Sequence, residues 1–257
     1  MKKLLAFDLD GTLAPSKSPC PDRISSLLDQ LLVHFQICVI SGGKFELFEN
    51  HLLANLKSDT KMLAKLHIMP TCGTRYYALD VHSGTWKKVY AEDFTTSEKK
   101  QIIKVLNEII AHLGLSRGKT YGDQIEDRGS QISWSALGQN IVDELGEEGV
   151  KLKEFWDPDN AKKTKIRDAL ALKLQNFEVR TGGLTTIDIT KPGIDKAYGM
   201  RKLMLSLGIS KEDILFFGDR LQEGGNDYPV RAMGIDSLEV GDWQDTALAL
   251  EAIGHVM

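Results

Sequence analysis

The sequence predicts an α/β protein with a parallel sheet in its core and an inserted α+β domain in its middle. Three observations lead to this prediction. Short apolar runs that end in polar turns occur near both ends of the chain. Amphipathic helical segments separate these runs, which is the order that parallel strands require. The middle of the chain does not alternate in this way and instead combines periodic helices with isolated strand candidates.

The first strand, helix and strand are expected near the amino terminus. Apolar runs occupy residues 4–7 and 37–40, and each ends in a polar turn. Between them, apolar residues recur at helical spacing at Ile24, Leu27, Leu28, Leu31 and Leu32. We therefore expect two parallel strands that are joined by a helix.

The carboxy-terminal third repeats this arrangement. A helix is expected from the apolar residues Ala197, Met200, Leu203, Met204 and Leu207. A strand over residues 214–217 and a turn at Gly218 and Asp219 follow, and a last helix is expected from about Asp245. Ligands of open α/β sheets bind beyond the carboxyl ends of the strands. The turns at Asp8, Ser41 and Asp219 are therefore expected to converge on one site.

The inserted domain is expected over residues 83–188, and the core over residues 1–82 and 189–257. Thr95 and Glu98 fit a capping box, and a strongly periodic helix up to Leu113 follows them. A second helix is expected over residues 166–174. Strand candidates are residues 131–135, 177–180 and 185–189. Three large aromatic residues are interpreted as packing residues: Trp86, Trp134 and Trp156.

The composition excludes several classes of protein. The chain has 257 residues, of which 42% are hydrophobic and 26% charged, as in ordinary globular proteins. Its net charge of -4 gives no attraction for a polyanion, so no nucleic-acid partner is expected. Asp8 interrupts the apolar amino terminus, and no run approaches about 18 apolar residues, so neither a signal peptide nor a membrane segment is expected. Three scattered cysteines favour a cytoplasmic protein, and the oligomeric state is left open, a homodimer included.

The segment after the first strand carries groups suited to phosphoryl transfer. This reaction needs a nucleophile, neutralisation of charge and a proton donor for the leaving oxygen. At a strand end, alternation directs Asp8 and Asp10 to the same side, and Gly11 lets the chain turn sharply. Asp8 is then a candidate nucleophile and Asp10 a candidate acid. The alternative is a simple turn, because Asp and Gly are common turn formers.

Four segments, in order, resemble the signatures of the haloacid dehalogenase superfamily of phosphotransferases. They are residues 8–12 (Asp-Leu-Asp-Gly-Thr), residues 41–43 (Ser-Gly-Gly), Lys196, and Gly218-Asp219 followed by residues 225–227 (Gly-Asn-Asp). The resemblance covers nearly the whole chain and implies a Rossmann-like core. It implies Asp8 as nucleophile and Asp10 as acid and base. Ser41 is implied as a hydrogen-bond donor to the phosphoryl group, and Lys196 as its countercharge.

The same resemblance implies a Mg²⁺ site. Its ligands are the Asp8 carboxylate, the Asp10 backbone carbonyl and Asp219, with Asn226 or Asp227 behind them. Mg²⁺ prefers oxygen ligands, and it offsets the repulsion between anionic Asp8 and an anionic substrate. Taken alone, Ser41 fits a helix cap and Lys196 a solvated helix residue, but their order beside the two aspartate motifs favours the catalytic interpretation.

The inserted domain is similar to the type IIB caps of that superfamily, and several segments resemble the eukaryotic-type phosphomannomutases. Residues 222–227 include their distinctive Gly-Gly-Asn-Asp, and residues 124–129 resemble the segment with a phosphate-binding arginine. The implied substrate contacts are Gly42, Gly43, Arg128, Gly183, Thr186 and Asp188. The alternative for Arg128 is an ion pair with Glu126 or Asp127, and for Thr186 and Asp188 it is an edge strand with polar residues.

Three departures from the phosphomannomutases concern arginines. Those enzymes carry arginine where this chain has Gln139, in the region of residues 151–153, and shortly after the first motif, where this chain has Pro15-Ser16-Lys17. A mutase holds the non-reacting phosphate of a sugar bisphosphate, which bidentate arginines do better than lysine or glutamine. We therefore interpret the chain as a magnesium-dependent phosphatase that acts on a sugar phosphate through an aspartyl-phosphate. The alternatives are a phosphomannomutase that interconverts mannose 6-phosphate and mannose 1-phosphate, and a non-catalytic sugar-phosphate-binding protein.

Overall fold

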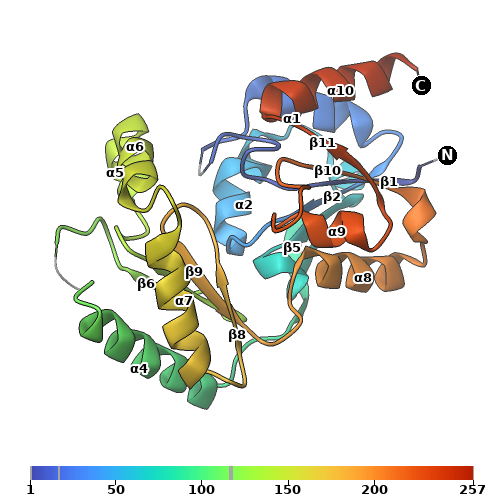
Figure 1. The fold of residues 1–257 in the computed structure, drawn as a ribbon. Helices are drawn as coiled ribbons and strands as arrows, with labels where there is room; N and C mark the ends of the chain where they lie inside the picture. The colour runs from blue at the N-terminus through green and yellow to red at the C-terminus, as the bar shows by residue number, and fades with distance from the viewer. Residues whose placement is uncertain (1, 17, 116–117, 257) are drawn as a thin grey trace. The chain divides into compact units, whose positions relative to one another are not determined.

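A computed structural model describes residues 2–16, 18–115 and 118–256 (Figure 1). Lys17, considered above, lies outside these residues. The chain forms two compact units: a core unit, Met1–Ala91 with Asp195–Met257, and an inserted unit, Glu92–Ile194. Each unit has its own sheet and its own apolar core. The α/β class expected from the sequence is confirmed.

The core unit is built on a seven-stranded sheet in the order β11-β10-β1-β2-β3-β4-β5. Its strands are β1 (Leu4–Phe7), β2 (Gln36–Ile40), β3 (Leu66–Met69), β4 (Arg75–Asp80), β5 (Thr85–Ala91), β10 (Ile214–Gly218) and β11 (Asp236–Glu239). The strands from β11 to β3 run parallel, while β4 and β5 form an antiparallel hairpin at the edge. The strands expected over residues 4–7, 37–40 and 214–217 are thus present as β1, β2 and β10.

Helices cover both faces of this sheet (Figure 1). They are α1 (Asp22–Leu31), α2 (Phe45–His51), α3 (Thr60–Leu63), α8 (Lys196–Leu207), α9 (Tyr228–Ala232) and α10 (Trp243–His255), with 3₁₀ turns at Leu53–Asn55, Thr71–Gly73 and Lys211–Asp213. Leu5 and Phe7 of β1 pack in a cluster with residues of α1 and α10, whereas Leu4 and Ala6 pack in a second cluster with residues of α8. Because both faces are covered, these strands are apolar throughout, which explains the short apolar runs of the sequence.

The inserted unit has a four-stranded antiparallel sheet in the order β6-β7-β9-β8. Its elements are α4 (Thr96–His112), β6 (Ile125–Asp127), β7 (Gln131–Ser135), α5 (Ile141–Leu145), α6 (Glu147–Trp156), α7 (Ala161–Lys173), β8 (Glu178–Thr181) and β9 (Thr186–Thr190). Residues of α4 and α7 pack with Ile132, Trp134 and Ile187 in one apolar cluster. Trp134 is fully buried there, as expected of a packing residue. The capping box of Thr95 and Glu98 starts α4 as expected.

The compact units do not begin and end where the sequence suggested. The expected boundary at residue 83 falls before β5, but β5 pairs with β4 and so belongs to the core sheet. The expected boundary at residue 189 falls inside β9, which pairs with β7 up to Thr190. An exposed hairpin strand lacks the long apolar run of a buried strand, so no local pattern indicates that the core extends to Ala91.

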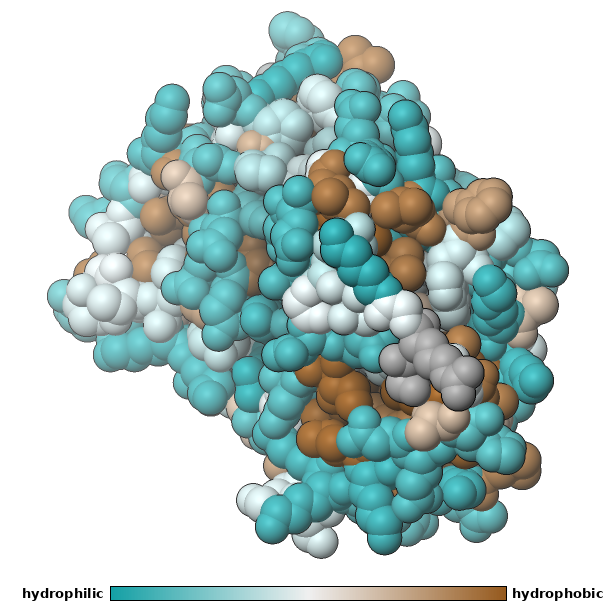
Figure 2. Space-filling view, turned by 90° about the vertical axis from the view of Figure 1, so that its left-hand side faces the viewer, coloured by the Kyte–Doolittle hydropathy of each residue, from teal (hydrophilic) through white to brown (hydrophobic). Residues whose placement is uncertain are grey.

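The side of the molecule in Figure 2 is mostly hydrophilic, with hydrophobic residues in smaller separate patches. Among the described residues, no helix has both the length and the apolar character needed to cross a bilayer. The described cysteines, Cys20, Cys38 and Cys72, are all free thiols.

His67 gives a prediction about stability. Its Nδ1 lies 2.8 Å from Tyr76 Oη and its Nε2 lies 2.7 Å from Gln36 Oε1, inside the core unit. Burial lowers the pKa of His67 to about 4. In the unfolded chain His67 has a pKa of about 6.5, so below that pH the unfolded chain binds a proton that the folded chain does not. The free energy of unfolding is therefore highest above pH 6.5 and decreases as the pH falls toward 4. The loss at pH 5 should be about 2 kcal/mol.

Urea unfolding of the wild type and of His67→Gln at pH 7.5 and pH 5 measures this effect. The variant should lose less free energy of unfolding than the wild type between the two pH values, whatever its stability at pH 7.5. His34→Gln, which changes an exposed histidine, is the control and should retain the full pH dependence. An equal loss in wild type and His67→Gln would assign the pH dependence to other groups.

Candidate active site

Three neighbouring parallel strands each end at a residue of the expected site. Asp8 follows β1, Ser41 follows β2, and Asp219 follows β10. The strand register aligns Phe7 with Val39 and Phe217, so these ends lie at the same edge of the sheet. Asp8 N donates to the Phe217 carbonyl at 3.0 Å and extends the pairing of β1 with β10. The pairing of the strands therefore fixes the backbone positions of Asp8 and Asp219.

A buried ion-pair network joins three segments at this edge. The Lys196 ammonium, at the start of α8, lies 2.5 Å from Asp8 Oδ1 and 2.5 Å from Asp227 Oδ1. The side chain of Lys196 is 1% exposed, that of Asp8 4% and that of Asp227 0%. Burial lowers the pKa of Lys196, but the two carboxylates outweigh it and leave the pKa raised above its usual value. Lys196 therefore stays protonated and is not a solvated helix residue.

The turn between Asp8 and Ala14 requires glycine at one position. Gly11 has a φ of +88°, and its N–H donates to the Ala14 carbonyl at 2.7 Å. A Cβ atom at Gly11 would lie 2.6 Å from Asp219 Oδ2. The glycine thus satisfies a left-handed backbone and a close approach to an acidic side chain. Asp10 precedes it and is half-buried.

The acidic side chains at this edge fit a divalent cation. Asp8, Asp219 and Asp227 each offer a carboxylate oxygen within 4.8 Å of the others. Burial raises the pKa of Asp8 well above its usual value, against the attraction of Lys196, and burial followed by the charge of Asp227 raises the pKa of Asp219. Lys196 is the buried cation of the cluster, and Arg220 Nε lies 3.7 Å from Asp219 Oδ2. Three carboxylates beside these two cations leave one excess negative charge, which a Mg²⁺ ion would neutralise with the oxygen ligands it prefers.

The hydrogen bonds of Asp227 separate its role from those of the other two carboxylates. Its Oδ1 accepts from Lys196, and its Oδ2 accepts from the backbone N–H of Arg220 at 3.1 Å. Asp8 and Asp219 are therefore better placed as direct metal ligands, while Asp227 holds Lys196. Asn226 is exposed, and its expected part in the metal site stays a prediction. The part of the Asp10 carbonyl also stays a prediction.

The Ser41-Gly42-Gly43 segment does not cap the helix that follows it. The residue at the N-cap of α2 is Lys44, without a side-chain cap. Ser41 is buried, and its Oγ accepts from the Gly43 N–H at 3.3 Å. The helix-cap alternative for Ser41 is therefore wrong, and its hydroxyl remains a candidate donor to a phosphoryl group.

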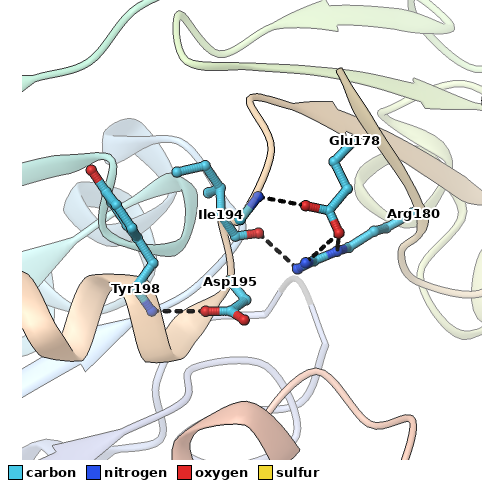
Figure 3. A network of polar contacts seen from close by, with 6 residues as sticks. Glu178, Arg180, Ile194, Asp195 and Tyr198 are labelled. Atoms are coloured by element: carbon cyan, nitrogen blue, oxygen red, sulfur yellow. Dashed lines mark hydrogen bonds and ion pairs between the residues drawn. The ribbon is translucent and has the colours of Figure 1, made fainter. Parts of the chain in front are cut away.

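A separate network fixes the backbone that leads to Lys196 (Figure 3). Arg180 donates two hydrogen bonds to Glu178 and one, of 2.7 Å, to the Ile194 carbonyl. Glu178 also accepts from the Gly193 N–H at 2.7 Å. At the next residue, the Asp195 carboxylate caps α8 by accepting from the Tyr198 N–H at 2.7 Å. Gly193, Ile194 and Asp195, which directly precede Lys196, thus each form a hydrogen bond of this kind.

In the inserted unit, Arg128 is engaged in an ion pair. Its Nε lies 2.7 Å from Glu126 Oε2, and its side chain is 11% exposed. The pairing that the sequence offered as an alternative is therefore present. Gln139, at a position where the resemblance implies arginine in mutases, donates to the Gln124 carbonyl at 3.3 Å. Both side chains have partners within the inserted unit.

The expected substrate contacts around Gly183 form one group. A Cβ atom at Gly182 would lie 2.5 Å from Asp188 Oδ2, and one at Gly183 would lie 3.8 Å from Thr186 Oγ1. Asp188 Oδ1 is buried and has no hydrogen-bond partner among the described residues. Strand pairing places Ser133 opposite both Glu126 and Asp188, so these side chains share a sheet face. Polar groups thus gather beside the glycine turn.

Sequence reasoning missed one cation of this group. Lys163 on α7 is buried, and its Nζ donates to the Gly183 carbonyl at 3.0 Å. The helix carries several lysines, and nothing in their spacing separates a buried one from solvated ones. The one local feature that could have indicated the start of α7 is Asp157. Its carboxylate accepts from the backbone N–H groups of Lys162 and Lys163 and fixes the first turn of α7.

The sequence pattern of a family described as haloacid dehalogenase-like hydrolase matches residues 5–229. The chain is 26% identical over 254 residues to the phosphomannomutase of Encephalitozoon cuniculi, which covers 95% of this chain and 91% of that protein. It is 27% identical over 236 residues to phosphomannomutase 1 of Mus musculus, which covers 89% of this chain and 83% of that protein.

Two solved structures share the fold. The IMP-bound, N-terminally truncated IMP-nucleotidase of Plasmodium falciparum matches with a TM-score of 0.69 and 20% identity, over 99% of this chain and 68% of that chain. A haloacid dehalogenase-like hydrolase from Bacteroides thetaiotaomicron matches with a TM-score of 0.62 and 17% identity, over 98% of this chain and 100% of that chain. These likenesses concern the fold alone.

The carboxylate cluster gives a prediction about the affinity for Mg²⁺. Asp219→Ala should raise the dissociation constant for Mg²⁺ at least about tenfold, because it removes one of two charged ligands. Isothermal titration calorimetry with MgCl₂ measures this. The control is Asp236→Ala. Asp236 lies on β11, pairs with Lys2 and is largely exposed. A titration of Asp219→Ala that superimposes on that of the wild type would remove Asp219 from the metal site.

Proposed function

The chain belongs to the haloacid dehalogenase-like hydrolase family, and we propose that it is a magnesium-dependent phosphatase that acts on a sugar phosphate. The family and the similarity to phosphomannomutases make it an enzyme, either a phosphatase or a phosphomutase. The observation that carries the proposal is the cluster of buried Asp8, Lys196 and Asp227 with half-buried Asp219 at the strand ends. In this proposal the inserted unit selects the substrate.

The reaction proceeds in two steps. A carboxylate oxygen of Asp8 attacks phosphorus, and the bond from phosphorus to the sugar oxygen breaks while Asp10 gives that oxygen its proton. The sugar leaves, and Asp8 is phosphorylated. Asp10 then takes a proton from water, the water oxygen attacks phosphorus, and the bond to Asp8 breaks. The products are the sugar and inorganic phosphate, and both aspartates return to their starting states.

Neighbouring groups of this chain support these steps by positioning and charge. Lys196 places its ammonium beside the attacking carboxylate at 2.5 Å and offsets the negative charge of the phosphoryl oxygens. Ser41 donates a hydrogen bond to one of those oxygens. Asp8 and Asp219 would hold a Mg²⁺ ion, which would supply further neutralisation of charge. Asp227 keeps Lys196 in place through its own ion pair.

Hydrolysis is favoured over mutase activity by the side chains of the inserted unit. A mutase holds the remote phosphate of a bisphosphate, a task that suits free bidentate arginines. Arg128 is instead paired with Glu126 at 2.7 Å, and Gln139 is bonded to backbone. Asp188 adds a negative charge on the face that Glu126 and Ser133 share. These groups suit the hydroxyl groups of a sugar better than a second phosphate.

Phosphomannomutase activity is the second candidate, and one observation favours it. The similarity to phosphomannomutases extends over 95% of the chain and includes both units. In that case the sugar bisphosphate formed from the aspartyl-phosphate would turn around and return its other phosphate to Asp8. The two activities share the first step and differ in whether water or a sugar hydroxyl takes the phosphoryl group.

We propose the cytoplasm as the compartment, which suits the free thiols.

Substitution of the two aspartates tests the chemistry. Asp8→Asn should abolish both release of phosphate from hexose phosphates and formation of phosphoenzyme, because an amide is a poor nucleophile. Asp10→Asn should still form phosphoenzyme from acetyl phosphate, whose leaving group needs no proton, yet turn over hexose phosphates at least about a hundredfold more slowly. Phosphate release and intact-protein mass spectrometry measure both effects.

Asp22→Asn, which changes an exposed residue of α1, is the control and should behave as the wild type. Substantial turnover by pure Asp8→Asn would exclude Asp8 as the nucleophile. Equal loss with acetyl phosphate and hexose phosphate in Asp10→Asn would exclude acid catalysis as the role of Asp10.

Substitutions at Arg128 and Gln139 test how the inserted unit affects the reaction of sugar bisphosphates. In the proposed phosphatase Arg128 stays paired with Glu126, so Arg128→Ala should change kcat/KM for a hexose bisphosphate and for p-nitrophenyl phosphate less than about threefold. A mutase that held the remote phosphate through Arg128 would instead lose about ten- to hundredfold with the bisphosphate alone, because a charged hydrogen bond contributes roughly 1.5 to 3 kcal/mol. Gln139→Arg should shift the products of hexose 1-phosphate with bisphosphate activator from free phosphate toward the 6-phosphate isomer. The two kcat/KM values and the product ratio, from phosphate release and chromatography, are measured together.

The matched control is Arg167→Ala, because Arg167 also pairs with a carboxylate of the inserted unit, Asp168, but on an exposed helix. It should leave all three quantities unchanged. A selective loss with the bisphosphate in Arg128→Ala would contradict the phosphatase proposal and favour the mutase, whereas an equal large loss with both substrates would show that Arg128 supports the structure.

A further inference from the structure

Three consecutive residues after β3 have a left-handed backbone. The φ angles are +49° at Thr71, +55° at Cys72 and +82° at Gly73. Glycine adopts this conformation readily, but a β-branched residue such as threonine is a true outlier there. Strain of this kind persists only where the surrounding structure holds the backbone, and it is concentrated at functional sites. The contacts of this turn therefore bear on its role.

On one side, the turn holds the segment that carries Ser41. Thr71 N–H donates to the Gly43 carbonyl, and Cys72 N–H donates to the Ser41 carbonyl, both at 3.0 Å. The left-handed backbone directs these two successive N–H groups at the two carbonyls that flank Gly42. The Ser41 N–H also donates to the carbonyl of Met69, at the end of β3. The backbone of Ser41 is thus held at both its N–H and its carbonyl.

On the other side, the turn lies directly against α8, the helix that begins with Lys196. A Cβ atom at Gly73 would lie 2.3 Å from Gly199 Cα, and one at Gly199 would lie 2.7 Å from the Cys72 carbonyl oxygen. Gly199 is about one helical turn after Lys196. Because neither position has room for a side chain, the backbone of the turn sets how closely α8 approaches the sheet.

A third contact fixes the turn from β5. Tyr90 Oη donates to the Gly73 carbonyl at 2.8 Å. Lys202 of α8 lies over the same Tyr90 ring, 4.6 Å from its centroid. Within the turn, Thr74 Oγ1 donates to the Thr71 carbonyl at 2.8 Å. The turn therefore joins β5, α8 and the Ser41 segment through backbone contacts.

We infer that the left-handed turn of Thr71, Cys72 and Gly73 is a positioning element that sets the place of Ser41 relative to Lys196. The inference rests on the proposed function, in which both residues act on one phosphoryl group. The turn reaches Ser41 through two hydrogen bonds and Lys196 through the glycine contact with its helix. Displacement of a group by about 1 Å can lower a rate by up to a hundredfold, so disturbance of the turn lowers kcat.

Cys72 tests the backbone conformation. Asparagine tolerates a left-handed backbone and valine does not. Cys72→Asn should keep kcat for p-nitrophenyl phosphate within about twofold of the wild type, whereas Cys72→Val should lower kcat at least about tenfold with KM changed less than about threefold. Unfolding curves establish that both variants are folded at the assay temperature. A kcat for folded Cys72→Val that equals that of Cys72→Asn would overturn the inference.

Tyr90 supplies a second test that removes only one hydroxyl. Tyr90→Phe should lower kcat about three- to tenfold, because the Gly73 carbonyl loses its donor. The matched control is Tyr76→Phe, which removes a hydroxyl bonded to His67 in the same unit. It should keep kcat within about twofold. Equal effects of the two substitutions on kcat would overturn the inference even if Cys72→Val did not fold.

Combination with Ser41→Ala separates positioning from general support of the structure. If the turn acts through Ser41, Tyr90→Phe should reduce kcat less in the Ser41→Ala background than in the wild type. Effects that multiply independently would overturn the positioning role while leaving the proposed function intact. If Ser41→Ala alone had the wild-type rate, the proposed role of Ser41 would fail, and the positioning role would fail with it.

Discussion

Lys196 lies 2.5 Å from both Asp8 and Asp227, and all three side chains are almost fully buried. Removal of charged groups from water is costly, so each member of this network depends on the others. The network also joins β1, α8 and the loop before α9, which are far apart in sequence. The fold must bring these segments together correctly, because an unpaired member would remain as a buried charge. The groups proposed for chemistry are thus also a constraint on the structure.

Features that depend on local pattern were predictable from the sequence. The apolar runs that became β1, β2 and β10 are buried on both faces, so their composition reports their environment directly. The convergence of Asp8 and Asp219 followed from parallel pairing, which places strand ends at one edge. In contrast, β5 is an exposed hairpin strand, and its membership of the core sheet depends on pairing with β4. No local pattern of residues specifies that pairing.

The site was predictable where a residue type reveals its role, and not where a role depends on neighbours. Asp8, Asp219 and Lys196 occur in a recognisable order, and the structure gathers them. Lys163 is one lysine among several on α7, and only its burial beside Gly183 distinguishes it. The left-handed backbone at Thr71 has no sequence signal at all, because threonine is unusual there. Tertiary contacts with the Ser41 segment and α8 impose that conformation.

The charges on one face of the inserted sheet bear on the choice between hydrolysis and mutase activity. Strand pairing aligns Glu126, Ser133, Asp188 and Arg180 in one row across its sheet. Glu126 on β6 pairs with Arg128, the residue that follows β6 by one position, and Glu178 on β8 pairs with Arg180. The positive charge available for a second phosphate is therefore already partly balanced. This balance of charge is the reason why hydrolysis, and not mutase activity, is the proposed function.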